Sequence, residues 1–169
     1  CCGSGILLIE AVTMALQQAP GLGRPFGLVG WADFDSELWE REEERARQRR
    51  RSDLDLAPVI GYEQDPLVAE QARDNIRAAG LEGLISVQSG SFEQQRLPSG
   101  PGLLVCNPPY GHRIGAEDDL EQLYRSLGSF LREQASGWQL WLLSGNASLT
   151  GALRLKASRR IPISNGGID

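Results

Sequence analysis

Apolar residues recur along this chain with two spacings, one typical of amphipathic helices and the other of short buried strands. Helical spacing predicts helices at residues 6–16, 35–51, 66–79, 119–134 and 149–155. Continuous apolar runs predict strands at residues 59–63, 84–87, 103–106, 138–143 and 160–163. Because strands alternate with helices, we expect an α/β fold whose mostly parallel sheet is covered by helices on both faces.

Local start and stop signals set several of the helix boundaries. Asp65 can cap the helix that Pro66 begins, because proline is tolerated at the first helical position. Gly80 can end the same helix. Ser36 is the expected N-cap of the second helix, and Leu38 is one of its apolar anchors.

Length and composition fit one domain, residues 1–169, with an insertion at about residues 31–57. The net charge of -5 argues against a domain that grips nucleic acid through net charge alone. No apolar run approaches the roughly 18 residues that a membrane span needs. The three cysteines form neither a disulfide framework nor a zinc site, so we expect a cytoplasmic protein with no metal and no membrane partner.

In parallel α/β folds, ligands bind beyond the carboxyl ends of the strands, and this chain carries distinctive residues at such positions. In the turn Cys2-Gly3-Ser4-Gly5, the glycines allow a ligand to approach the backbone, and the following helix offers free N–H groups. Packing alone can also explain such a turn, and the third glycine of the dinucleotide fingerprint is missing. Glu63 ends a strand, where its carboxylate either accepts both hydroxyls of a ribose or faces solvent.

The most specific segment is Asn107-Pro108-Pro109-Tyr110, which follows an apolar strand. Two consecutive prolines hold the backbone extended and remove two N–H donors, which leaves carbonyl groups available. Asn107 adds an acceptor oxygen, and Tyr110 adds a flat ring for stacking. The exocyclic amine of a flat base would find two acceptors and a stacking face here, whereas a plain turn is the alternative interpretation.

Together these segments resemble the class I S-adenosylmethionine-dependent N-methyltransferases, whose amino-methylating motif is N-P-P-Y. The flanking sequences are similar to the THUMP-associated RNA methylases. Residues 2–11 resemble the C-G-S-G-T-x-L-I-E-A turn of that family. Residues 61–80 resemble its G-x-D-x-D-P…A-x-x-N…A-G segment, and residues 107–113 resemble its N-P-P-Y-G-x-R motif.

Three further features are similar to the bacterial large-subunit rRNA guanine-N2 methyltransferases of this family. They are the insertion around residues 35–39, the stretch at 137–146 and the ending at 165–167. The resemblance therefore spans nearly the whole chain. It implies a Rossmann-like class I fold, S-adenosylmethionine as the cofactor, and methyl transfer to the N2 amine of a guanine in 23S rRNA.

The resemblance also implies roles for single residues. The implied catalytic residues are Asn107, Pro108 and Tyr110. The implied cofactor-binding residues are Cys2, Gly3, Ser4, Gly5, Glu63, Ser91, Phe92 and Asn107. The implied RNA contacts are Pro109, Tyr110 and Arg113. The family's aspartate that would face the adenine amine is replaced by Ser91 or Ser89, and Phe92 is a candidate to stack on the adenine instead.

The family's first strand would precede Cys1, so we expect a fragment of a longer protein. Its further domains would be a THUMP domain and, as in fused relatives, a second methyltransferase. Three alternatives stay open: a DNA adenine-N6 methyltransferase, a protein glutamine-N5 methyltransferase, and an RNA-docking fragment without catalysis. For RNA phosphates, the candidate contacts are four basic residues with no acids around them, namely Arg154, Lys156, Arg159 and Arg160.

Overall fold

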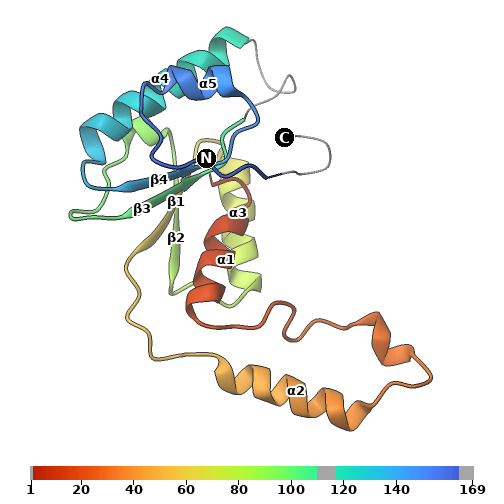
Figure 1. Cartoon of the computed structure of the whole chain (residues 1–169). Helices are drawn as coiled ribbons and strands as arrows, with labels where there is room; N and C mark the ends of the chain where they lie inside the picture. The colour runs from red at the N-terminus through yellow and green to blue at the C-terminus, as the bar shows by residue number, and fades with distance from the viewer. Residues whose placement is uncertain (1, 110–116, 164–169) are drawn as a thin grey trace. The chain divides into compact units, whose positions relative to one another are not determined.

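The computed structural model describes residues 2–109 and 117–163, so Tyr110, Arg113 and the ending at 165–167 lie outside the described residues. The first half of the chain forms α1 (Ile6–Ala15), η1 (Gly27–Gly30), α2 (Ser36–Arg49), β1 (Val59–Glu63), α3 (Pro66–Ala78) and β2 (Ile85–Ser89) (Figure 1). The second half forms η2 (Phe92–Gln94), β3 (Leu103–Cys106), α4 (Glu117–Gln134), β4 (Gln139–Leu142) and α5 (Ala147–Ala152). The predicted alternation of strands and helices is confirmed.

The strands pair as β1 with β2 and as β3 with β4. The β3–β4 pair is parallel, in a register that places Leu103 opposite Gln139 and Cys106 opposite Leu142. Parallel pairing was expected, because a helix connects these two strands. The strand predicted at residues 160–163 is wrong: this stretch is described and has no regular structure.

The predicted N-cap of α2 is also wrong by one residue. Asp35 caps the helix, because its carboxylate accepts a hydrogen bond of 2.9 Å from the N–H of Leu38. Asp35 has an extended backbone, whereas Ser36 is already helical, and only the extended residue can turn its side chain back onto the first N–H groups.

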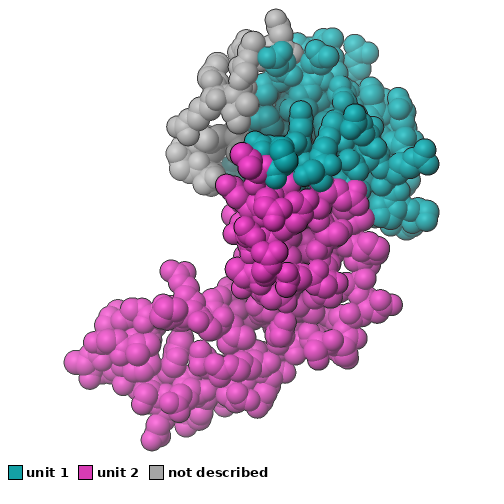
Figure 2. Space-filling view, turned by 180° about the vertical axis from the view of Figure 1, so that it is seen from behind, with its two compact units in different colours: residues 1–2, 62–66, 89–169 teal, residues 3–61, 67–88 magenta. Residues whose placement is uncertain are grey.

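The chain divides into two compact units, which Figure 2 colours separately. One unit comprises residues 1–2, 62–66 and 89–169, and the other comprises residues 3–61 and 67–88. The core of the second unit joins α1 and α3 with the start of β2 through Val12, Leu16, Ile76, Leu81 and Ile85. Each unit has its own core, and the single domain expected from the sequence stays a prediction.

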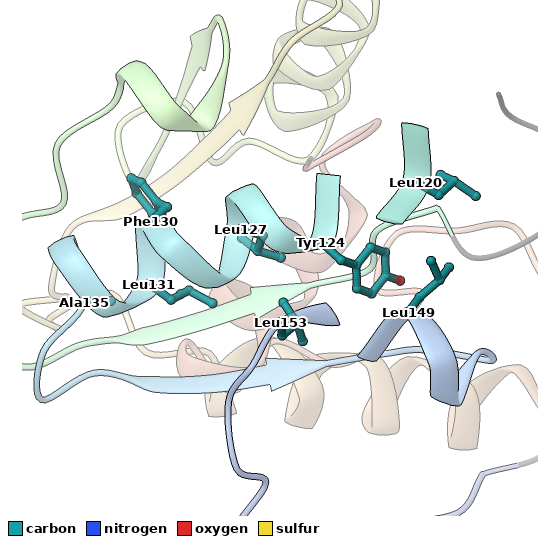
Figure 3. Packing of buried hydrophobic residues seen from close by; sticks show 8 residues of the cluster. All are labelled: Leu120, Tyr124, Leu127, Phe130, Leu131, Ala135, Leu149 and Leu153. Atoms are coloured by element: carbon teal, nitrogen blue, oxygen red, sulfur yellow. The ribbon is translucent and has the colours of Figure 1, made fainter. Parts of the chain in front are cut away.

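The core of the first unit lies between α4, α5 and one face of β3–β4 (Figure 3). Its buried members are Leu120, Tyr124, Leu127, Phe130, Leu131, Ala135, Leu149 and Leu153. Side chains of the two strands pack against this cluster from below, among them Leu104, Leu140 and Leu142. In the described part of the chain, no helix is long and apolar enough to cross a membrane.

Candidate functional site

The glycine turn before α1 depends on its glycines for two different reasons. Gly3 and Gly5 both have left-handed backbones, with φ values of +56° and +83°. At Gly5, a Cβ atom would also lie 3.3 Å from the Cβ of Ala72 on α3. The turn is fixed to α3 by a second contact, because the side-chain amide of Asn75 donates a 2.9 Å hydrogen bond to the carbonyl of Ser4. The conformation of the turn is therefore fixed by its contacts with α3.

Glu63 ends β1 with its carboxylate turned onto the following turn. Its Oε1 accepts hydrogen bonds from the backbone N–H groups of Gln64, at 2.9 Å, and Asp65, at 3.2 Å. These two donors fix the direction of the carboxylate. A carboxylate held in this way is suited to accept hydroxyl groups from a ligand beyond the strand end.

Backbone hydrogen bonds bring several predicted residues together at the ends of β1 and β2. The N–H of Cys2 donates to the carbonyl of Tyr62 at 2.8 Å, and the N–H of Gly90 donates to the carbonyl of Glu63 at 2.9 Å. All of these residues belong to the first unit. The structure thus places Cys2 beside Tyr62 and Gly90 beside Glu63, and a ligand shared by Cys2 and Glu63 stays a prediction.

Ser91 and Phe92 have local structural partners. The hydroxyl of Ser91 caps η2 by accepting a 3.3 Å hydrogen bond from the N–H of Glu93, and it donates to the Glu93 carboxylate at 3.2 Å. The ring of Phe92 meets that of Phe130 edge to face, with centroids 5.5 Å apart. The structure therefore shows Phe92 anchored to the α4 core, and its role in stacking on an adenine stays a prediction.

The turn after β3 combines one exposed polar side chain with buried neighbours. Asn107 is exposed, whereas Cys106 before it is 5% exposed and Pro108 after it is less than 2% exposed. Burial raises the pKa of the Cys106 thiol, so this residue stays protonated and serves as part of the core. The buried proline fixes its own φ and restricts the backbone of Asn107, so the exposed amide stands on a rigid turn.

Tyr124 supports this turn from the core. It is fully buried on α4, and its hydroxyl donates a 3.3 Å hydrogen bond to the carbonyl of Pro109. Asn75 was noted in the sequence only as part of the A-x-x-N motif, and Tyr124 was not singled out. The signal for Tyr124 was present, because a tyrosine between Leu120 and Leu127 on an apolar helix stripe must find a partner for its hydroxyl.

The predicted site residues are distributed over both units. The first unit holds Cys2, Glu63, Ser91, Phe92, Asn107, Pro108 and Pro109, and the second holds Gly3, Ser4 and Gly5. Tyr110 and Arg113 lie outside the described residues. Within the described residues, no group of three or more His, Cys, Asp or Glu side chains could hold a metal ion.

Comparisons with known proteins identify the family of the chain. The family model described as "RMKL-like, methyltransferase domain" matches residues 1–169. The chain is 41% identical to the ribosomal RNA large subunit methyltransferase K/L of Syntrophotalea carbinolica and 38% identical to that of Marinomonas sp.. Each match covers 99% of this chain and 24% of the relative, so the chain spans about a quarter of the length of these curated relatives.

Solved structures give the same result for the fold. SMU.472, described as a methyltransferase and complexed with SAH, superposes with a TM-score of 0.91 at 28% identity. A "possible methylase" from Clostridium difficile 630 superposes with a TM-score of 0.90 at 29% identity. Both comparisons cover 99% of this chain and 44% of the solved chain. The fold expected from the sequence, that of a class I methyltransferase, is therefore confirmed.

Proposed function

Since this chain belongs to the family of RMKL-like methyltransferase domains, we propose that it transfers a methyl group from S-adenosylmethionine to the N2 amine of a guanine in 23S rRNA. The observation that carries the proposal is the turn after β3, where the exposed Asn107 stands beside the buried Pro108. The names of the curated relatives support ribosomal RNA as the substrate. The SAH bound to SMU.472 supports the cofactor, because SAH is what S-adenosylmethionine becomes after methyl transfer.

The residues at the strand ends fit a nucleoside cofactor of this kind. Around the Cβ position of Gly3, no atom of the described residues lies within 4 Å, so the backbone there has room for a ligand. The Glu63 carboxylate, oriented by two N–H groups, is suited to the ribose hydroxyls. When bound, the cofactor supplies an electrophilic methyl group on a positively charged sulfur. We assign its binding to the implied residues, namely Cys2, Gly3, Ser4, Gly5, Glu63, Ser91, Phe92 and Asn107.

Asn107 and Pro108 act on the target amine. The exocyclic nitrogen of guanine is a poor nucleophile, because its lone pair is delocalised into the ring. The side-chain oxygen of Asn107 and the carbonyl of Pro108 accept the two hydrogens of this nitrogen and localise its lone pair for attack. As the new N–C bond would form, the bond between the methyl carbon and the sulfur would break, and the nitrogen, now positive, would lose one proton to solvent. The rate comes from orientation and electrostatics in a rigid turn.

The remaining motif residues hold the base and its strand. Tyr110 stacks on the guanine, which must first leave its own stack at a cost of about a few kcal/mol. Pro109 and Arg113 contact the RNA around the target nucleotide. Tyr124 acts as a positioning residue, since its 3.3 Å hydrogen bond to the Pro109 carbonyl ties the turn to the buried core.

Further domains of the protein would contribute to binding of the RNA substrate. The curated relatives are about four times as long as this chain, which covers 24% of each. We therefore expect the THUMP domain and second methyltransferase implied by the resemblance to act with it. A ribosomal RNA substrate also implies that the protein acts in the cytoplasm.

The proposal is tested by Asn107→Ala. Transfer of labelled methyl groups from S-adenosylmethionine to 23S rRNA should fall below detection, while cofactor affinity in calorimetry stays unchanged. The matched control is Gln139→Ala, which removes an exposed amide at the opposite end of the neighbouring strand β4 and should leave turnover intact. Near-normal turnover of Asn107→Ala would contradict the assigned role. Wild-type activity on DNA or on a protein glutamine, and not on RNA, would favour the alternative substrates.

A further inference from the structure

Charge is unevenly distributed along this acidic chain. After Glu133, no acidic residue follows until Asp169, although the net charge of the whole chain is -5. The interval contains four basic residues within a short stretch: Arg154, Lys156, Arg159 and Arg160. All four side chains are exposed, and residues 154–160 are called the basic segment below.

Several other arginines form ion pairs with nearby acidic residues. Examples are the ion pairs Arg47–Glu43 at 3.0 Å, Arg73–Glu70 at 2.7 Å and Arg77–Asp74 at 2.6 Å. Within the described ranges 2–109 and 117–163, no side chain of the basic segment forms an ion pair. A group of exposed cations without acidic partners attracts polyanions, since nothing in the fold competes for the charge.

The basic segment starts from a fixed point in the core. Leu153 is only 5% exposed, and its carbonyl accepts a 2.9 Å hydrogen bond from the Arg132 guanidinium. The same carbonyl lies against Gly128 of α4, where a Cβ atom would come within 2.1 Å of the oxygen. Only a glycine allows the chain to pass this close to α4. The direction in which the segment leaves α5 is therefore determined by packing.

Arg154 itself adopts an unusual backbone. Its φ is +53°, in the left-handed region where a helix usually ends on glycine, and its N–H donates to the carbonyl of Gly151 at 3.1 Å. Glycine would take this conformation at lower cost. The left-handed residue therefore ends the helix and marks the start of the basic segment.

The anchor of the basic segment belongs to the same core that supports the turn after β3. Leu153 lies in the cluster that contains Tyr124, and the Tyr124 hydroxyl holds the carbonyl of Pro109 (Figure 3). Both features lie in the first unit, so one packed cluster fixes the start of the basic segment and the turn proposed to receive the base.

We propose that the basic segment contacts the backbone phosphates of the RNA substrate. This inference rests on the proposed function, because it assumes an RNA whose guanine enters the turn after β3. Such contacts position a nucleic acid without reading its sequence, so the segment would contribute affinity and register while the turn selects the amine. An acidic protein or an anionic membrane surface is the competing partner, which the experiment below distinguishes.

The test removes the charges and keeps polar side chains, in the variant Arg154→Gln/Lys156→Gln/Arg159→Gln/Arg160→Gln. Binding to a 23S rRNA fragment is measured at salt concentrations between about 50 and 200 mM. Each lost phosphate contact should reduce the slope of log affinity against log salt by roughly 0.7 to 0.9, so the loss of all four contacts should reduce it by about 3. Methylation should show a higher KM for RNA and an unchanged kcat.

A matched control removes the same number of charges at arginines that already have acidic partners. It carries Arg45→Gln, Arg47→Gln, Arg77→Gln and Arg125→Gln, and these arginines are paired with Glu42, Glu43, Asp74 and Glu121 in the wild type. Its salt slope should change by less than about 1, since these charges are already neutralised locally. The double variant Arg159→Gln/Arg160→Gln, which leaves the anchor untouched, should give about half the effect if the quadruple variant folds poorly.

Equal salt slopes for the quadruple variant and its control would overturn the inference while leaving methyl transfer to RNA intact. A wild-type protein that binds RNA with the expected slope difference but methylates only DNA or glutamine would overturn the proposed function alone. Failure of the wild type to bind RNA would overturn both. Binding to vesicles of anionic phospholipid or to polyglutamate that the quadruple variant loses, with RNA binding unchanged, would assign the basic segment to another partner.

Discussion

Replacing Gly128 by alanine probes the packing that fixes the start of the basic segment. Gly128 is a buried residue of α4, and an added Cβ would lie 2.1 Å from the oxygen of Leu153 and 2.8 Å from its carbonyl carbon. Both are backbone atoms, so rotation of a side chain cannot relieve the overlap. Either α4 or the chain after α5 has to move.

The magnitude follows from three contributions. Overpacking of a well-packed core costs about 1 to 3 kcal/mol. A shift of the Leu153 carbonyl also weakens its hydrogen bond from Arg132, a bond worth roughly 0.5 to 1.5 kcal/mol. Against these, alanine is favoured over glycine inside a helix by about 1 kcal/mol. We therefore expect Gly128→Ala to lower the free energy of unfolding by about 1 to 3 kcal/mol.

Urea unfolding followed by circular dichroism measures this change, with the slope of the transition as a check that the unfolded state is unaltered. Gly151→Ala on α5 is the matched control, because no described atom lies within 4 Å of its Cβ position. That variant should be as stable as the wild type or more stable, by up to about 1 kcal/mol. A Gly128→Ala protein that is equally stable or more stable would refute the packing described for this core.

Two further predictions concern the parts that position the candidate site. Tyr124→Phe should cost about 1 kcal/mol of stability and lower kcat without changing cofactor affinity, since it frees the Pro109 carbonyl. The control Tyr62→Phe removes a 3.4 Å hydrogen bond to the Arg96 carbonyl and should cost similar stability while it retains kcat. Equal values of kcat for the two variants would argue against a role of Tyr124 in positioning the turn after β3. Gly5→Ala should lower the free energy of unfolding by about 1 to 2 kcal/mol because of its φ of +83°, and by more because of the contact with Ala72. The same variant should bind the cofactor more weakly in calorimetry. Gly23 has a similar φ of +81°, and no described atom lies within 4 Å of its Cβ position. Gly23→Ala should therefore lose only the stability that the backbone conformation costs. Equal losses of stability in the two variants would exclude a role for the contact with Ala72.

Local patterns in the sequence were sufficient to predict most elements of the fold. Helix α3 was expected at residues 66–79 and runs over Pro66–Ala78, because proline, apolar spacing and Gly80 all act within the segment itself. The N-cap of α2 differed by one residue, since Asp35 and Ser36 are both good caps and only the backbone geometry selects between them.

Features that depend on distant contacts could not be predicted in the same way. Ile161 and Ile163 alternate with other residues as in a strand, yet they are 50% and 56% exposed and have no paired strand in the described part of the chain. The ring contact between Phe92 and Phe130 on α4 is one such feature, and the stacking of Phe92 on an adenine stays a prediction. The hydrogen bond from Tyr124 to Pro109 likewise joins residues 15 positions apart, which sequence spacing does not reveal.

The central claim is that the turn at Asn107–Pro108 presents acceptors to the exocyclic amine of a guanine in RNA. It is tested most directly by incubating the protein with unmodified 23S rRNA and S-adenosylmethionine, digesting the RNA to nucleosides and identifying the methylated product by mass spectrometry. The account predicts N2-methylguanosine, and predicts none when Asn107 is replaced by alanine. A product methylated on adenine, or N2-methylguanosine formed equally well by the Asn107→Ala variant, would contradict it.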